Sequence, residues 1–481
     1  MVITLPKKRF NIEESKIDPG TLAAGRYGTQ EMCDIFGSEK TFEYSLMVQA
    51  QAAKTLSRLY PDIVSKEDAV EIESKANLKT INPNRIRELE AKTGHDVIAI
   101  NTALEEVVND SAKTQINKGK TSADTTQPAR AVQLKKALEV IIDSVENIRD
   151  ILLEKSMDWI NVPHMDVTHG YDALPTVAGR PLSHYAEMLQ SDLELLKYVY
   201  KNSTVGKWGD ATGNHHSATA LGIDGIKLQE EYCKDLGIGY TIASAQLPGL
   251  EFEADIWFAL ARVSETLNNL ARYIEWGRSD DVDVFVNASP VKQKGSSAMP
   301  HKDAKNGNPT AEEQFMSIKN YITGNLMTAM ENCHMPYARD LAASANSRIN
   351  FEDGFKTLDH SIRNLANRLY YIEVKKERSI ERVERSYGVV TAQLFMTYLT
   401  DSRKVKNPLS RSQAHDLMGE LATKAWNEKK QFVEILLQNK EVTERLSKET
   451  ILELADPKKY IGQSKEIVKA VYDKFHGKRT L

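Results

Sequence analysis

Cysteine is scarce in this chain of 481 residues, and its three cysteines lie far apart. Cys33, Cys233 and Cys333 form no CxxC pair, which argues against a disulfide framework and a zinc knuckle. No apolar run approaches the roughly 20 residues that a transmembrane helix needs. Residues 1–10 contain basic side chains without an apolar segment after them, so we expect no secretory signal. Together these absences predict a cytoplasmic protein.

An excess of charge is also missing, since 63 Lys and Arg residues face 67 Asp and Glu residues for a net charge of −4. Such a balance predicts neither nucleic acid nor a membrane surface as a partner. The chain has no GxxxxGK[ST] phosphate loop and no HExxH motif, and Gly237-Ile-Gly239 lacks the third glycine of a dinucleotide fingerprint. His215 and His216 are adjacent and cannot easily share a metal from one helical face, so we predict no metal site.

Proline is rare and unevenly placed, with none between Pro128 and Pro163 or between Pro336 and Pro408. Because proline breaks helix interiors, such gaps permit long helices. Apolar residues recur there at steps of three and four, which is the pattern of a buried helical seam. The seams cover residues 134–152, 256–274 and 355–372, with a weaker one over 315–330. Strand patterns are few and short, at 240–243 and 282–286, so we predict an all-α fold.

Polar and charged residues cluster near 118–126 and 374–384, and we place domain limits there. The prediction is an N-terminal helical domain over 1–120, a central long-helix bundle over 121–375 and a C-terminal helical domain over 376–481. Seams of this length on several helices exceed what one chain easily covers, which indicates a homo-oligomer.

The most informative segment is Gly295-Ser-Ser-Ala-Met-Pro-His-Lys302. Serine hydroxyls and backbone N–H groups on a pliable loop, with lysine nearby, suit contact with an anion. The same residues also fit an ordinary surface loop. Thr168-His169-Gly170 offers a proton-transfer side chain beside a glycine that permits close approach, although a lone histidine is more often structural.

Two further segments carry charge. In Thr93-Gly94-His95-Asp96 the carboxylate either lies near the imidazole or faces away from it. Arg339-Asp340-Leu341 is followed by Ser344 and Arg348, which are neighbours on one helix face and could clamp a phosphate or carboxylate. A solvated, salt-bridged helix face is the alternative reading.

Taken together, these segments resemble a known family. Gly295–Lys302, with Asn308-Pro309 downstream, is similar to the signature loop of the fumarase/aspartase superfamily, whose members release fumarate by β-elimination. His301 after Met-Pro resembles the adenylosuccinate lyase family within it. The other matching segments occur in that family's order: Arg26-Tyr27, His95-Asp96, Thr121-Ser122, Thr168-His169-Gly170, Gln246, Arg339-Asp340-Leu341 and Tyr460-Ile461-Gly462.

The resemblance implies a cofactor-free and metal-free lyase. It would remove fumarate from adenylosuccinate, giving AMP, and from the succinyl-carboxamide ribonucleotide of de novo purine synthesis. It further implies a homotetramer whose central domains pool their helices, with active sites where three subunits meet.

The resemblance also assigns roles to single residues. Ser296 would be the general base and His169 the general acid, oriented by Glu313. The implied contacts to the succinyl end and the base are Thr121, Ser122, Gln246, Ser297, Lys302 and Asn308. The implied contacts to the phosphate and ribose are Arg26, Tyr27, Arg339, Ser344 and Arg348, with His95 and Asp96 near the phosphate or the acid.

The chain departs from the family pattern at several places. Val167 and Tyr171 replace the usual Arg and Gln around Thr-His-Gly, and Leu250 stands where a basic residue or His is common. Residues 303–307 separate the loop lysine from its asparagine, where one residue is usual. A sister lyase acting on argininosuccinate, or a non-catalytic oligomeric scaffold with this fold, therefore remain alternative interpretations.

Overall fold

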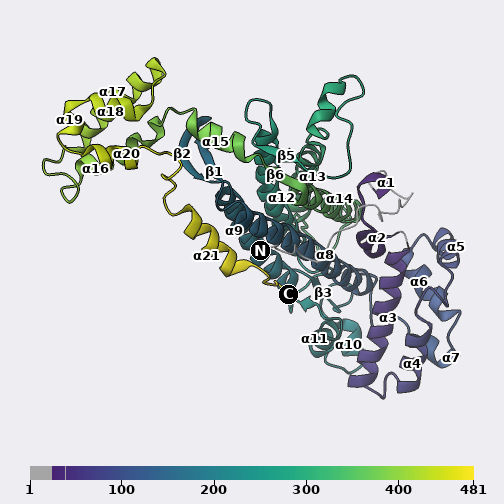
Figure 1. The fold of residues 1–481 in the computed structure, drawn as a ribbon. Coiled ribbons are helices and arrows are strands. Elements are labelled where there is room, and N and C mark those ends of the chain that lie inside the picture. The colour runs from purple at the N-terminus through teal and green to yellow at the C-terminus, as the bar shows by residue number, and fades with distance from the viewer. Residues whose placement is uncertain (1–23, 38) are drawn as a thin grey trace.

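The computed structural model describes residues 24–37 and 39–481. Helices make up most of the described chain, and the strands are short, which confirms the predicted all-α class (Figure 1). In this described part, no helix is both long and apolar enough to cross a membrane.

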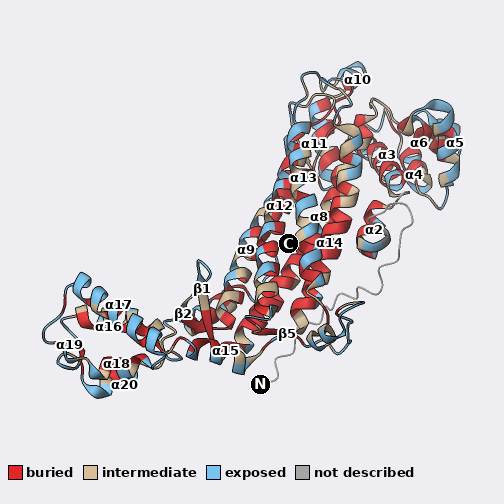
Figure 2. Cartoon of the chain, turned by 90° about the horizontal axis from the view of Figure 1, so that it is seen from above, coloured by how far each residue is buried: buried red, intermediate tan, exposed pale blue. Residues whose placement is uncertain are grey.

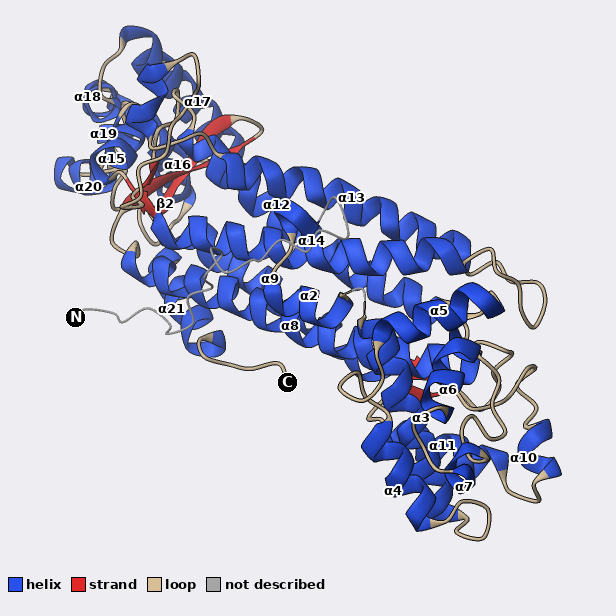
Figure 3. Ribbon diagram, turned by 90° about the vertical axis from the view of Figure 1, so that its right-hand side faces the viewer, coloured by secondary structure: helices blue, strands red, loops and turns tan. Residues whose placement is uncertain are grey.

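Five long helices form the centre of the molecule: α8 (Ala123–Asp158), α9 (Gly179–Asn202), α12 (Glu251–Arg278), α13 (Thr310–Asn332) and α14 (Ser344–Tyr371). Each packs on the next in that order, and α14 packs back on α8, so the helices close into a bundle. Figure 3 shows them running side by side along the long axis of the molecule.

The predicted seams lie inside these helices and form their core. Leu138 and Ile148 of α8, Leu267 of α12 and Leu365 of α14 are fully or almost fully buried in one hydrophobic cluster. Figure 2 shows the buried residues concentrated along the bundle. The third seam runs one residue too far, because Ile372 opens strand β6 (Ile372–Val374).

Shorter helices pack at one end of the bundle around a second core. Their bounds are α3 Lys40–Leu59, α4 Lys66–Lys75, α5 Pro83–Thr93, α6 Asp96–Glu105, α7 Asp110–Lys113, α10 His216–Ala220 and α11 Gly225–Asp235. Helices α1 (Ala24–Tyr27) and α2 (Gln30–Phe36) instead pack against α14, and α2 also packs against α8. Trp208 and Tyr232, from the middle of the chain, join this second core. The second core therefore contains residues from both sides of the predicted domain limit at residue 120.

The C-terminal helices gather at the opposite end of the bundle (Figures 1 and 3). Their bounds are α15 Lys376–Glu384, η3 Val389–Thr391, α16 Ala392–Thr400, α17 Arg411–Glu428, α18 Phe432–Gln438, α19 Lys440–Thr443, α20 Lys448–Leu454 and α21 Ser464–Phe475. Residues 395–451 have a core of their own, whereas α21 returns to pack along α9 and α8.

Three two-stranded sheets complete the described fold. Strands β1 (Pro163–Thr168) and β2 (Tyr171–Val177) form an antiparallel hairpin, with a register shift between Met165 and Val167. Strand β3 (Val205–Gly206) pairs in parallel with β4 (Gly239–Tyr240), and β5 (Phe285–Asn287) pairs antiparallel with β6. The two sequence-predicted strands overlap β4 and β5.

The direction of the bundle helices decides where the candidate residues lie. Helices α8, α12 and α14 begin at the end that carries α3 to α7, and they finish at the end that carries the C-terminal helices (Figure 3). The ends of these three helices lead directly into β1, β5 and β6. At 1.5 Å per residue, the 36 residues of α8 separate the two ends by about 54 Å.

Candidate active site

One group of candidate residues gathers where α6, α8, α12 and α14 begin. It contains eight predicted residues: His95, Asp96, Thr121, Ser122, Gln246, Arg339, Ser344 and Arg348. A small apolar cluster containing Ala123, Leu247 and Leu250, with Met335 and Ala343 packed on it, ties three of the segments together. Because helix N-termini carry partial positive charge, four of them at one end of a bundle favour an anion.

His95 lies beside the residues that precede α8. Its Nε2 is 3.1 Å from Ser122 Oγ, and its Nδ1 is 3.4 Å from Asp96 Oδ1. The carboxylate therefore lies near the imidazole, which settles the alternative left open by the sequence. Gln246 belongs to the same region, since its backbone N–H donates to Ala338 O at 3.1 Å, next to Arg339.

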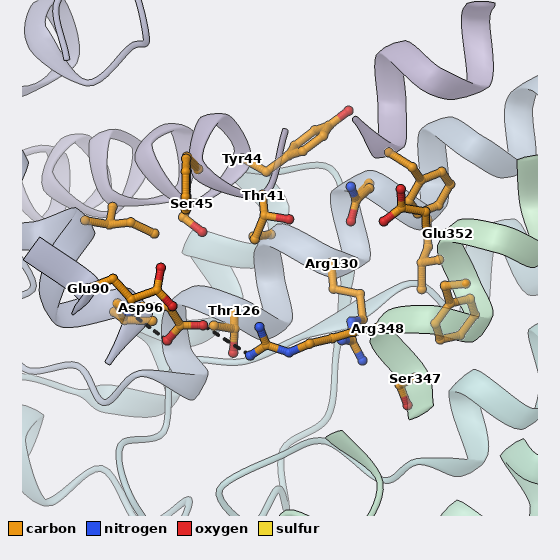
Figure 4. A pocket seen from close by; sticks show the side chains of 18 residues that line it. Thr41, Tyr44, Ser45, Glu90, Asp96, Thr126, Arg130, Ser347, Arg348 and Glu352 are labelled. Carbon is orange, nitrogen blue, oxygen red and sulfur yellow. Dashed lines mark hydrogen bonds and ion pairs between the residues drawn. The ribbon is translucent and has the colours of Figure 1, made fainter. Parts of the chain in front are cut away.

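Three arginines surround two adjoining cavities of about 290 and 40 Å³. Arg348 and Arg130 line both cavities, and Arg339 lines the smaller one together with Ser344. Figure 4 shows Arg130 and Arg348 close together, with the Arg348 guanidinium directed at Asp96. Ser347 and Thr126 add hydroxyl groups to both cavities. We call this group the arginine pocket.

The three arginines are not equally paired. Arg348 Nη2 lies 3.1 Å from Asp96 Oδ2, and Arg130 Nη1 lies 3.1 Å from Glu253 Oε1. In the described part of the chain, Arg339 forms no ion pair with a carboxylate. Burial lowers the pKa of Arg339, and the neighbouring Arg130 and Arg348 lower it further. A half-buried cation among other cations is an environment that an added anion stabilises.

Two residues that build this end of the site belong to no sequence motif. Arg130 is one, because only the packing of α8 against α14 reveals it. Asp124 is the other: its buried carboxylate accepts from Lys207 Nζ at 2.5 Å, Gly209 N at 2.9 Å and Thr121 N at 2.8 Å. It thereby joins the start of α8 to the Gly-rich segment that follows β3. Asp124 lies two residues after Ser122, and no motif marks it.

His169 lies at the other end of the bundle, at the tip of the β1–β2 hairpin. Thr168 pairs with Tyr171, which leaves His169 and Gly170 as a two-residue turn with φ of 55° and 83°. Positive φ at both positions is typical of the tight turns that match strand twist. The turn holds the imidazole out of the fold, and His169 is exposed.

The signature loop follows β5 at the same end of the bundle. Ser296 Oγ accepts from the backbone N–H groups of Ala298 and Met299 at 3.2 and 3.1 Å. Ser297 is exposed, and Lys302 lies in the short 3₁₀-helix η2 (Pro300–Lys305). Asn308 follows just before α13. Two N–H donors on one hydroxyl oxygen favour negative charge on that oxygen.

The remaining candidates lie elsewhere. Glu313 is exposed in the first turn of α13, whereas its neighbour Glu312 is fully buried and binds Arg278 at 3.2 Å. Arg26 is exposed in α1, which packs against α14, and the Tyr27 ring meets His360 edge-on at 5.8 Å. Both lie along the bundle rather than in the arginine pocket.

A single chain thus holds the candidate residues in separate places. The arginine pocket and the pair of His169 and Ser296 lie at opposite ends of the bundle. In the described residues, no group of three or more His, Cys, Asp or Glu side chains is arranged to hold a metal ion.

Comparison with known proteins agrees with the motifs that occur at both ends. Residues 25–324 match a family model described as lyase, and residues 388–471 match one described as adenylosuccinate lyase C-terminus. The adenylosuccinate lyase of Methanocaldococcus jannaschii is 31% identical over 455 residues, covering 94% of this chain and 96% of the relative. The chain belongs to the adenylosuccinate lyase family. The family's enzyme from Pyrococcus horikoshii is 27% identical, covering 93% of this chain and 96% of the relative.

Solved structures show the same fold in more distant relatives. The fumarate lyase of Mesorhizobium sp. BNC1 matches with a TM-score of 0.80 at 19% identity, covering 93% of this chain and 98% of that chain. The 3-carboxy-cis,cis-muconate lactonizing enzyme of Pseudomonas putida matches with a TM-score of 0.79 at 20% identity, covering 93% of this chain and 97% of that chain. The chain therefore has the helical fold shared by these proteins.

Proposed function

We propose that the enzyme removes fumarate from adenylosuccinate, giving AMP, and from the succinyl-carboxamide ribonucleotide of de novo purine synthesis. The observation that carries the proposal is the match to adenylosuccinate lyases over more than nine-tenths of the chain, together with the C-terminal model of that family. The arginine pocket supports it, because both substrates carry a phosphate. We place the reaction in the cytoplasm.

The proposed chemistry needs a base, an acid and an electron sink. Ser296 takes a proton from the succinyl carbon next to a carboxylate, and the electron pair moves into that carboxylate. His169 protonates the leaving nitrogen as the C–N bond breaks, with Glu313 orienting the imidazole. Serine acts as a base only where negative charge on its oxygen is stabilised. The N–H groups of Ala298 and Met299 supply part of that stabilisation.

The substrate would be held from both ends. Arg339, Ser344 and Arg348 bind the phosphate, helped by Arg26 and Tyr27, and His95 and Asp96 lie beside them. Lys302 binds a succinyl carboxylate as a point charge. The remaining predicted contacts to the succinyl end and the base are Thr121, Ser122, Gln246, Ser297 and Asn308.

These residues meet only if several subunits share a site. Because about 54 Å of α8 separates the arginine pocket from His169, one chain cannot place both on one nucleotide. We propose a homotetramer in which the bundles associate and each active site draws its groups from different subunits. Exposed apolar residues on α12 and α13 support such association: Phe258, Met327 and Met330 are each more than half exposed.

The test of the function is fumarate release by the purified enzyme. Adenylosuccinate, the succinyl-carboxamide ribonucleotide and argininosuccinate are offered separately, and the ultraviolet absorbance change is recorded. We expect turnover with the first two substrates and none with the third. Turnover with argininosuccinate alone would assign the chain to the sister lyase, and no turnover with any of them would favour the scaffold interpretation.

A further inference from the structure

Asp303 to Gly307, the five residues that stand where one is usual in the signature loop, form a dense set of contacts. Asn306 is only 5% exposed and adopts a left-handed backbone with φ of 53°. Its side-chain Nδ2 donates to Asn287 O at 3.2 Å and to Ser289 O at 3.0 Å, and its Oδ1 accepts from Gln293 N at 3.0 Å. Its backbone carbonyl accepts from Asn287 Nδ2 at 2.8 Å.

Asp303 makes a second connection, closer to the serines. Its carboxylate accepts from Gly295 N at 2.8 Å and from Lys294 Nζ at 2.9 Å. Gly295 also packs tightly against Lys302, because a Cβ at Gly295 would lie 2.6 Å from the Lys302 carbonyl carbon. The backbone that enters the signature loop at Gly295 is thus held against the backbone that leaves it at Lys302 and Asp303.

The inserted residues are in turn fixed to the bundle. Arg278 Nη2, from the last turn of α12, donates to Gly307 O at 2.9 Å, and Lys305 lies 3.1 Å from both Asp280 and Asp283. Arg278 is itself 3.2 Å from the buried Glu312 of α13. Helices α12 and α13 therefore hold the inserted residues in place through Arg278.

Only the segment from Ser296 to Lys302 lies between these connections. It contains the proposed base and the proposed carboxylate ligand. A short segment whose two ends are held together has far fewer conformations than a free loop of the same total length.

We propose that Asp303 and Asn306 are positioning residues that hold the two limbs of the signature loop together and so aim Ser296 and Lys302 at the substrate. This inference rests on the proposed function of Ser296. The insertion lengthens the loop without loosening its tip, since each added polar residue crosses to the opposite limb or to the bundle. A misplacement of about 1 Å at a reacting group can lower the rate about 100-fold. The contacts of Asp303 and Asn306 should therefore affect kcat as well as folding.

The experiment first measures fumarate release by the wild-type enzyme, which tests the proposed function independently. Asp303→Ala removes the acceptor for Gly295 N, and Asn306→Gly removes the amide while glycine still adopts the left-handed backbone. We expect each variant to lower kcat by about 10- to 100-fold with a much smaller change in KM. Amide hydrogen exchange at Gly295 and Gln293 should become faster in the corresponding variant.

Two matched variants separate positioning from general damage. Asp303→Asn keeps an oxygen that accepts from Gly295 N and should restore most of kcat. Lys294→Ala removes only an exposed ion pair, since Lys294 is 88% exposed, and should leave kcat unchanged. If the wild type is active and both Asp303→Ala and Asn306→Gly have a normal kcat, the positioning role is overturned. Loss of kcat in Asp303→Asn equal to that in Asp303→Ala also contradicts the proposal.

Discussion

Arg348 and Arg339 differ in their ion pairs within the arginine pocket. Arg348 is already paired with Asp96, whereas Arg339 is half-buried and has no carboxylate ion pair in the described structure. A bound phosphate could therefore pair directly with Arg339, whereas it would have to compete with Asp96 for Arg348. Neither difference is visible in the sequence, where Arg339 simply begins the Arg-Asp-Leu segment and Arg348 follows it.

We expect Arg339→Ala and Arg348→Ala each to weaken AMP binding by about 1.5–3 kcal/mol, the range for hydrogen bonds to charged groups. Asp96→Asn should strengthen AMP binding, because it releases Arg348 from its carboxylate partner. Calorimetric titration of AMP into each variant measures the effect. Unchanged AMP affinity in both arginine variants would leave the solvated salt-bridge interpretation standing.

His164 links stability to pH. It is buried at the base of the hairpin, with Nδ1 at 2.9 Å from Ser379 Oγ and Nε2 at 3.2 Å from Tyr273 Oη. Burial and, to a smaller extent, the neighbouring Arg382 lower the pKa of His164 to about 4, against the opposing effect of Asp172. Below about pH 6.5 the unfolded chain binds a proton that the folded chain does not. Stability must therefore fall as the pH drops from about 6.5 to about 4.

We expect this imidazole to account for about 2–4 kcal/mol of the acid sensitivity. His164→Asn should lower the melting temperature at pH 7 yet flatten its decline between pH 6.5 and 4.5. Melting curves across that range provide the measurement. His415→Asn is the control, because His415 is 76% exposed. An equally steep decline in His164→Asn and wild type would contradict this account.

At the scale of elements, the seams predicted the bundle because their period reports directly on burial. They could not predict the β1–β2 hairpin, since Asp166 and Asp172 interrupt its apolar pattern and its stability depends on contacts with α15. They also could not place Arg130 or Asp124 in the site, because neither belongs to a motif. The candidate residues were readable as motifs, but their distribution between two ends of the bundle needed the helix directions.

Asp124 fixes the first turn of α8 to its surroundings. It and Lys207 are both fully buried, and the Lys207 ammonium also donates to Asp210 O at 2.8 Å. Removing one partner of a buried pair leaves an uncompensated charge, so we expect Asp124→Ala to destabilise the fold by about 3–5 kcal/mol. The double variant Asp124→Ala/Lys207→Met should recover much of that loss.

Chemical denaturation of the wild type, the two single variants and the double variant measures this coupling. The start of α8 also carries Thr121 and Ser122, so Asp124→Ala should raise KM for adenylosuccinate as the segment loosens. Additive effects of the two single substitutions would show that the pair contributes nothing as a pair.

At the scale of the whole molecule, the length of the bundle is the reason for the proposed sharing of active sites between subunits. The helices that give the fold its core also hold His169 and Ser296 far from the arginine pocket, so under the proposed function an isolated chain would hold no complete active site. The proposed association of bundles would cover the exposed apolar residues of α12 and α13 and would bring the two different ends of the bundle together. A loss of activity on dilution would follow from the same arrangement.

Two inactive variants in one assembly test whether His169 and Ser296 of one active site come from the same subunit or from different subunits. His169→Ala should lower turnover by about 10²–10⁴-fold, the usual contribution of a positioned acid. Ser296→Ala should abolish turnover but still bind substrate, because the lost hydroxyl supplies chemistry rather than affinity.

The two variants are mixed in equal amounts, dissociated in denaturant and refolded together. If each site takes His169 and Ser296 from different subunits, both groups are intact in about a quarter of the sites, and activity returns to about that fraction of wild type. Refolded wild type sets the scale, and each variant refolded alone sets the background. If one subunit supplies both groups, no mixed site is intact, and the mixture stays as inactive as its components.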